Sequence, residues 1–151
     1  MYKNILVPVD GSPTGERGLV EAIGLARALG SRIRLVHIVN EMILASPDGV
    51  AVNIGPLLEA LRASGRQVLD AADRAVRAAG IETDNVLVEE IGNQAGPAIL
   101  QQAKEWPAEL IVCGTHGRRG MRRIVLGSDA EYIVRQATIP VMLIRSAEGV
   151  R

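Results

Sequence analysis

Five short apolar runs alternate with helical patterns along the chain, and this alternation constrains the fold more than any other feature. Each run is nearly continuous instead of switching between apolar and polar residues, which is typical of strands covered on both faces. The spacing of the runs predicts a parallel sheet with right-handed crossovers and helices on both sides, a three-layer α/β/α domain. The runs are Ile5–Val7, Leu35–Val39, Val86–Val88, Leu110–Cys113 and Val141–Ile144.

Four helical patterns fill the gaps between the runs. Ser12 and Pro13 open the first, because serine caps a helix and proline fits its first turn, and Gly30 ends it. The second has apolar positions from 58 to 79, and the third at 99, 100 and 103, with its start open between Asn93 and Gly96. The fourth begins near Ser128, with apolar positions at 133, 134 and 137. Residues 40–56 contain two prolines and two glycines and predict a surface loop, and residues 1–151 are expected to form one domain.

Composition and charge argue against several classes of function. Seventeen basic residues balance seventeen acidic ones, whereas binding to nucleic acid or a membrane surface usually needs a basic excess. The first apolar run is interrupted by Asp10 and falls short of the roughly 7–15 apolar residues of a secretory signal, and no run approaches a span of ~20 residues. The single cysteine, Cys113, cannot form an internal disulfide. We therefore expect a cytoplasmic protein.

The position of a site follows from the expected sheet. Ligands of open parallel sheets bind beyond the carboxyl ends of the strands, at the point where the strand order reverses. The first run ends in the segment PVDGS, at residues 8–12, and the fourth ends in GTHG, at residues 114–117. If these two strands are neighbours, both loops face one crevice.

The strongest local motif follows the fourth run and reads GTHGRRGMRRIVLGSDAE, with the spacing Gly114-x2-Gly117-x9-Gly127-Ser128. Glycine lets backbone N–H groups approach an anion without interference from a Cβ atom. A helix that begins near Ser128 would add free N–H groups and its dipole, both of which favour phosphate. Neither a P-loop nor a dinucleotide fingerprint is present. The residues alone therefore predict a site for an anion or a nucleotide.

With these segments the chain resembles the universal stress protein family over essentially its whole length. The G-x2-G-x9-G-[ST] spacing is that family's ATP-binding motif, and ILVPVDGS, LVHIV, LIVCGTHGRRG and IPVMLIR are similar to family segments in the same order. The resemblance implies a five-stranded parallel sheet in the order 3-2-1-4-5, of the Rossmann-like nucleotide-binding (HUP) type. It also implies ATP as ligand, with or without Mg²⁺, and a homodimer formed through the last strand, Thr138 to Arg145.

The resemblance also assigns residues to the ligand. Asp10 would contact adenine or ribose with Pro8 and Val9 beside it, and Ile38 would lie against the adenine. Further positions near the base, ribose or phosphates are Cys113, Gly114, His116, Gly117, Gly127, Ser128, Asp129 and Ala130. ATP-binding members often have a small or apolar residue and then Ser or Thr where this chain has Asp129 and Ala130. A carboxylate repels a triphosphate unless it points away or holds a metal, and alanine removes a hydroxyl donor.

Several of these residues have purely structural interpretations. Ser128 and Glu131 have the spacing of a capping box, and a carboxylate at 129 favours the helix dipole. Asp10 could cap the turn that follows it. His37 is interpreted as a hydrogen-bonded core residue and Cys113 as a small buried residue. Trp106-Pro107 is interpreted as packing a helix end. The arginines at 118, 119, 122 and 123 either contact phosphate or belong to a solvated loop.

Three functions remain open at this point. The first is a regulatory ATP-binding module of a stress response, acting as a dimer. The second is a slow ATPase, for which the sequence shows no clear general base and no Walker lysine. The third is a nucleotide-free interaction or chaperone-like dimer, as in family members that lack the motif. No catalytic residue and no metal ligand is assigned, and the protein partner is unknown.

Overall fold

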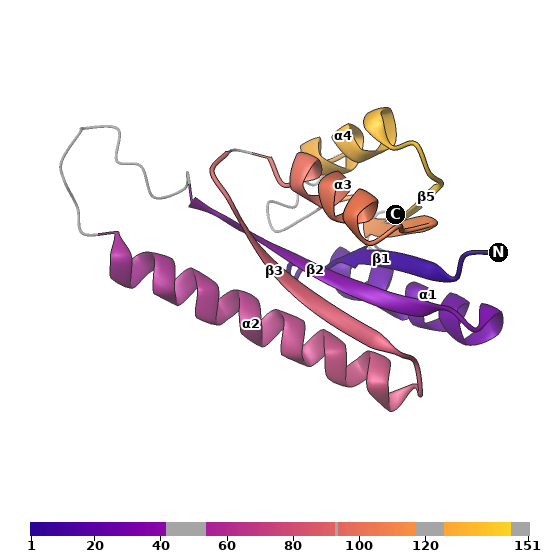
Figure 1. The fold of residues 1–151 in the computed structure, drawn as a ribbon. Coiled ribbons are helices and arrows are strands. Elements are labelled where there is room, and N and C mark those ends of the chain that lie inside the picture. Colours follow the sequence, from indigo (N-terminus) through magenta and orange to yellow (C-terminus); the bar gives the residue numbers. More distant parts are fainter. Residues whose placement is uncertain (42–53, 93, 117–125, 146–151) are drawn as a thin grey trace, which may run out of the picture.

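The computed structural model describes residues 1–41, 54–92, 94–116 and 126–145. Five parallel strands form one sheet in the order β3-β2-β1-β4-β5, as predicted (Figure 1). The sheet order places β1 between β2 and β4, so the chain reverses its direction of winding at β1. The strands are β1 (Asn4–Pro8), β2 (Arg32–Asn40), β3 (Thr83–Glu90), β4 (Leu110–Gly114) and β5 (Val141–Ile144).

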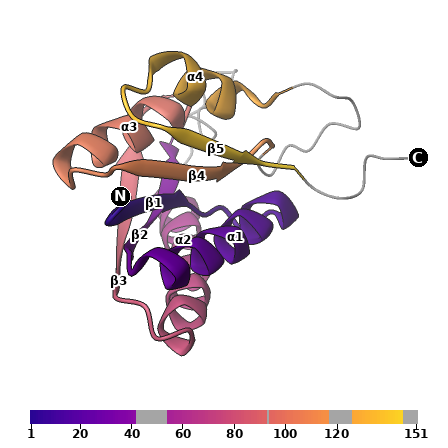
Figure 2. The same cartoon turned by 90° about the vertical axis from the view of Figure 1, so that its right-hand side faces the viewer.

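Four helices cover the two faces of the sheet, which confirms the predicted three layers. The helices α1 (Pro13–Leu29) and α2 (Gly55–Ala78) lie on one face, and α3 (Gly96–Glu105) and α4 (Ser128–Gln136) lie on the other (Figures 1 and 2). Alternation along β1 divides the core accordingly. Ile5 and Val7 pack on the α1–α2 side, whereas Leu6 packs on the α3–α4 side.

Helix boundaries follow local chemistry. The Ser12 hydroxyl accepts a hydrogen bond from the Gly15 N–H at 3.1 Å, and Gly30 ends α1 in the left-handed conformation with φ +67°, as predicted. The helix α3 begins at Gly96, which decides between its two predicted starts. The predicted loop at residues 40–56 is too long at both ends. Residue 40 belongs to β2, and Gly55 and Pro56 begin α2 because proline fits a first helical turn, while residues 42–53 lie outside the described part.

The two edge strands are less covered than the sequence predicts. In β3 the side chains of Asp84, Asn85 and Glu89 are exposed, and in β5 Met142 is 39% exposed. Each of these strands has a hydrogen-bonded neighbour on one side only. The prediction of burial on both faces is therefore wrong for β3 and β5, because the helices pack mainly over the three central strands and α2 covers β3 on one face only.

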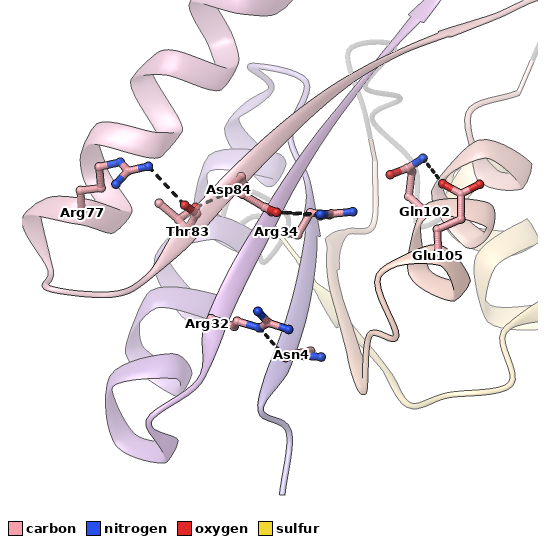
Figure 3. A network of polar contacts seen from close by, with 8 residues as sticks. All are labelled: Asn4, Arg32, Arg34, Arg77, Thr83, Asp84, Gln102 and Glu105. Carbon is pink, nitrogen blue, oxygen red and sulfur yellow. Dashed lines mark hydrogen bonds and ion pairs between the residues drawn. The ribbon is translucent and has the colours of Figure 1, made fainter.

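Trp106 anchors the end of α3 to the sheet, as predicted for this helix end. Its ring is buried, and the guanidinium carbons of Arg32 and Arg34 each lie 5.1 Å from the ring centroid. Figure 3 shows how these arginines are held: Arg34 pairs with Asp84 through two bonds of 2.9 and 2.6 Å, and Arg32 donates to Asn4 at 2.8 Å. The contact links α3 to strands β1, β2 and β3.

Candidate functional site

The loops that follow β1 and β4 meet at the carboxyl end of the sheet. The two strands are parallel neighbours, with Ile5 beside Leu110, and the Thr14 hydroxyl donates to the carbonyl oxygen of His116. A Cβ atom at Gly114 would lie 2.9 Å from the backbone of Thr14. The predicted meeting of these two loops is therefore confirmed, and α1 packs tightly against the end of β4.

The end of β1 is organised around the start of α1. The Asp10 carboxylate accepts the Ser12 N–H at 2.9 Å, and a Cβ atom at Gly15 would lie 2.8 Å from the same oxygen. Asp10 therefore caps this turn, as its structural interpretation predicted. Before it, Pro8 is half-buried, while Val9 is buried and donates its N–H to β2.

Neighbouring residues of β2 face opposite sides of the sheet. The His37 Nδ1 atom lies 2.8 Å from the Val9 carbonyl oxygen, and the ring is buried under α2, so the predicted core position is confirmed. Ile38 is half-buried on the other side, where it packs against the core beneath α3 and α4 and lies beside Val88 of β3. Ile38 thus lies on the α4 side of the sheet.

The end of β4 combines a buried thiol with an incompletely paired histidine. Burial raises the pKa of the Cys113 thiol to about 12. The Thr115 hydroxyl lies 3.0 Å from Nδ1 of His116. The Nε2 atom of His116 is shielded from solvent and has no hydrogen-bond partner in the described part of the chain. A ligand oxygen at this position could complete its hydrogen bonding.

The helix α4 begins at Ser128, and Gly127 is its N-cap. The Gly127 carbonyl accepts the first helical hydrogen bond, from the Glu131 N–H at 2.8 Å, so Ser128 lies one residue too late to cap. The predicted capping box is therefore wrong. The Gly127 N–H donates to Thr115 at 2.8 Å, and a Cβ atom at Gly127 would lie 3.1 Å from that oxygen. This N–H is thus not available to a ligand.

The next three amides are open. Among the described residues, the N–H groups of Ser128, Asp129 and Ala130 have no acceptor, and no side chain caps this helix. The first N–H groups of a helix lack partners within the helix, and the positive end of the dipole lies there. The start of α4 is therefore suited to an anion, whereas Ser12 and Asp10 already fill the start of α1.

Asp129, in the first turn of α4, reaches the start of α3. Its Oδ1 atom accepts the Gly96 N–H at 2.9 Å, so one carboxylate lies at the starts of two helices. A Cβ atom at Gly96 would lie 2.8 Å from the Tyr132 ring, which shows how closely α3 and α4 approach. The expected interaction of Asp129 with a helix dipole is confirmed and extends to α3. Within the described ranges, no three His, Cys, Asp or Glu side chains gather to form a metal site.

An open depression of about 780 Å³ lies at the opposite, amino edge of the sheet. Three basic residues and two acidic residues line it, so its charges largely offset one another; they are Lys3, Arg27, Arg32, Glu82 and Glu109. Residues that end α1 and α2 also line it, and the negative ends of helix dipoles disfavour anions. The depression therefore does not compete with the carboxyl edge as an anion site.

Most of the predicted site residues lie at the carboxyl edge, on β1, β2, β4 or the start of α4. Gly117 and the four loop arginines lie outside the described residues. Sequence reasoning missed three contributors, namely Thr14, Thr115 and Gly96. Thr115 lies inside the glycine motif and could have been examined as a loop-forming residue. Neither Thr14 nor Gly96 carries a sequence feature that points across the fold to its partner.

The sequence and fold of this chain are similar to those of known proteins. The family model for the universal stress protein family matches residues 1–145. The chain belongs to the universal stress protein family. A universal stress protein of Methanocaldococcus jannaschii, MJ0531, is 27% identical over 148 residues, which cover 96% of this chain and 83% of that protein. In this chain itself, none of the described helices is long and apolar enough to cross a membrane.

Solved structures are similar to this chain over nearly its whole length. A universal stress protein family structure from Burkholderia pseudomallei is 32% identical with a TM-score of 0.79, and it covers 96% of this chain and 97% of that one. A universal stress protein from Archaeoglobus fulgidus in complex with dAMP is 26% identical with a TM-score of 0.68, covering 95% of this chain and 98% of that one. An adenine nucleotide thus binds to one protein of this fold and family.

Proposed function

We propose that this universal stress protein binds an adenine nucleotide, ATP in the first place, at the carboxyl edge of its sheet. One observation carries the proposal: the amides of Ser128, Asp129 and Ala130 are unused within the described chain, at a helix start that no side chain caps. They follow the one motif whose spacing matches the family's ATP-binding motif. The dAMP complex of the Archaeoglobus relative supports the choice of an adenine nucleotide.

In this proposal the ligand spans the two loops. The base and ribose lie against Ile38, the end of β1 and the end of β4, and the phosphates lie at the start of α4. His116 and Gly117 complete the phosphate site, with the unpaired Nε2 of His116 as a further group for a phosphate oxygen. Gly127 shapes the site through Thr115 and does not donate its own N–H.

The proposed output is regulation by occupancy. In this proposal any Mg²⁺ enters with the nucleotide. Binding at the carboxyl edge would change the dimer or a surface for a partner. We propose that this occurs in the cytoplasm, where the lone buried thiol of Cys113 is compatible with reducing conditions.

The test replaces one amide without breaking the helix. Ser128→Pro removes the N–H at the first helical position, where proline is tolerated, and the extended backbone of Gly127 at φ −61° and ψ 150° suits a residue before proline. Because a hydrogen bond to a charged group contributes about 1.5–3 kcal/mol, we expect ATP affinity to fall about tenfold or more in titration calorimetry.

The matched control is Ser128→Ala, which keeps the amide and removes only the hydroxyl. It should cost less affinity than the proline variant. Titrations are run with Mg²⁺ and with a chelator, and phosphate release is measured alongside to detect slow hydrolysis. Absence of binding by the unmodified protein at millimolar ATP in both buffers would overturn the proposal and favour the nucleotide-free dimer.

A further inference from the structure

The start of α4 holds a negative charge of its own. Asp129 is the second residue of the helix, it is half-buried, and its Oδ1 atom accepts the Gly96 N–H of α3 at 2.9 Å. The close contact between Gly96 and Tyr132 keeps α3 against α4 at this point. The carboxylate is therefore held in the first turn of α4, the same turn that carries the open amides.

A second carboxylate in the same helix turn differs in position. Glu131 is exposed, and its side chain lies 3.6 Å from Arg135 on the following turn. An exposed and paired charge is screened strongly by water and salt, whereas a partly buried charge close to the ligand is screened much less. Of the two, Asp129 is the one that a bound phosphate chain would experience.

We propose that Asp129 limits the affinity that the β- and γ-phosphates of a nucleotide add at this site. The inference rests on the proposed function and deepens it. The helix start supplies a fixed positive potential equivalent to about half a unit charge, which attracts the first phosphate. Every further phosphate adds roughly one negative charge near the same carboxylate, and like charges within a few ångströms repel. The ligand class is therefore an adenine nucleotide for which added β- and γ-phosphates gain little affinity.

The alternative role for this carboxylate is to hold Mg²⁺ together with the phosphates. The Oδ1 atom of Asp129 is already paired with Gly96, and no cluster of three potential metal ligands occurs in the ranges that the structure describes. A carboxylate that held Mg²⁺ would favour the triphosphate, because the metal would bridge to its oxygens. The two roles predict opposite signs for the same substitution, so one titration distinguishes them.

The experiment compares AMP and ATP in the same calorimetric titration, with a chelator present, for the unmodified protein, Asp129→Asn and Glu131→Gln. Asparagine keeps an oxygen that accepts the Gly96 N–H and removes only the charge. We expect Asp129→Asn to raise ATP affinity about fivefold to tenfold and AMP affinity by less than about threefold. Glu131→Gln, which removes a charge from the same turn, should leave the ATP-to-AMP ratio unchanged.

The outcomes of this titration distinguish failure of the role of Asp129 from failure of nucleotide binding itself. If AMP and ATP bind and the ratio is the same in Asp129→Asn, this inference is wrong and the proposed function stands. If ATP affinity falls in Asp129→Asn only when Mg²⁺ replaces the chelator, the carboxylate holds a metal and the inference is overturned. Should no variant bind either nucleotide, the proposed function itself fails. Asp129→Ser, which also removes the charge, gives the same comparison if the asparagine variant does not fold.

Discussion

At the scale of single residues, Cys113 illustrates how burial changes chemistry at the site. The thiol lies at the end of β4, where burial disfavours the thiolate and raises its pKa to about 12. Nucleophilic and redox reactions of cysteine need the thiolate. Cys113 is therefore a packing residue in the protein without ligand, and its reactivity should be low at neutral pH.

This shift predicts a pH dependence with a definite sign. Because the pKa of the thiol in the folded state lies above the ordinary cysteine pKa of 9.0 that applies in the unfolded chain, the thiol stabilises the fold fully below pH 9, and this contribution is lost as pH rises toward 12. The stability advantage of the unmodified protein over Cys113→Ala should shrink by about 1 kcal/mol between pH 8 and pH 10. Urea unfolding of both proteins at both pH values measures it. A constant difference would show that the thiol titrates normally.

Two glycines show where residue patterns are ambiguous. The motif spacing led us to assign Gly114 and Gly127 to close approach of an anion, but each is also required by an internal contact. A Cβ atom at Gly114 would meet Thr14, and one at Gly127 would meet the Thr115 carbonyl. Ligand approach and tight packing demand the same residue, so spacing alone could not separate them. Gly114 and Thr14 lie far apart in the sequence, and a loop separates Gly127 from Thr115. The sequence therefore does not show that either pair is in contact.

At the scale of elements, helix positions were predictable and helix ends less so. Apolar periodicity and the capping residues Ser12 and Gly30 located α1 almost completely. The start of α4 was predicted near Ser128, where it lies, but its cap was not, because the extended backbone of Gly127 makes that glycine the N-cap. The carboxylate contact from Asp129 to Gly96 was also beyond reach, since it depends on how α3 packs against α4.

The packing of α2 gives a prediction at this scale. A Cβ atom at Gly65 would lie 2.6 Å from the His37 ring and 2.9 Å from Leu87, so Gly65→Ala forces α2 away from β2. We expect a loss of about 1–3 kcal/mol in the free energy of unfolding. The control is Gly24→Ala in α1, where nothing lies within 4 Å and the gain in helix propensity should stabilise by about 0.5–1 kcal/mol. Urea unfolding that gives equal values for the two variants would contradict this account.

At the scale of the whole molecule, strand alternation predicted the layers, whereas the strand order came from the family resemblance. Many sheets satisfy the same alternation, and the observed order 3-2-1-4-5 makes β1 and β4 neighbours. That adjacency brings the two motif-bearing loops together through Thr14 and His116. The same strand order leaves β3 and β5 at the edges of the sheet. A local pattern of apolar residues does not show that helices cover these two strands less than the central ones.

The edge strand β5 leads to a prediction about assembly. Among the described strands it pairs with β4 alone, so within that part of the chain its other backbone edge is open to a second copy, and Met142 is 39% exposed. We expect the protein to sediment as a dimer formed through Thr138 to Arg145. Met142→Lys should convert it to a monomer, because a lysine at the interface would be desolvated without a partner.

The control for this assembly is Asn85→Lys, which places the same charge on β3 at the opposite edge, where the side chain is already exposed. That variant should remain a dimer at the same concentration in sedimentation velocity. Dissociation by Asn85→Lys and not by Met142→Lys would move the interface to β3. A monomer at all concentrations for the unmodified protein would remove the dimer from the proposal, while nucleotide binding would stand, because every residue proposed to contact the ligand comes from a single chain.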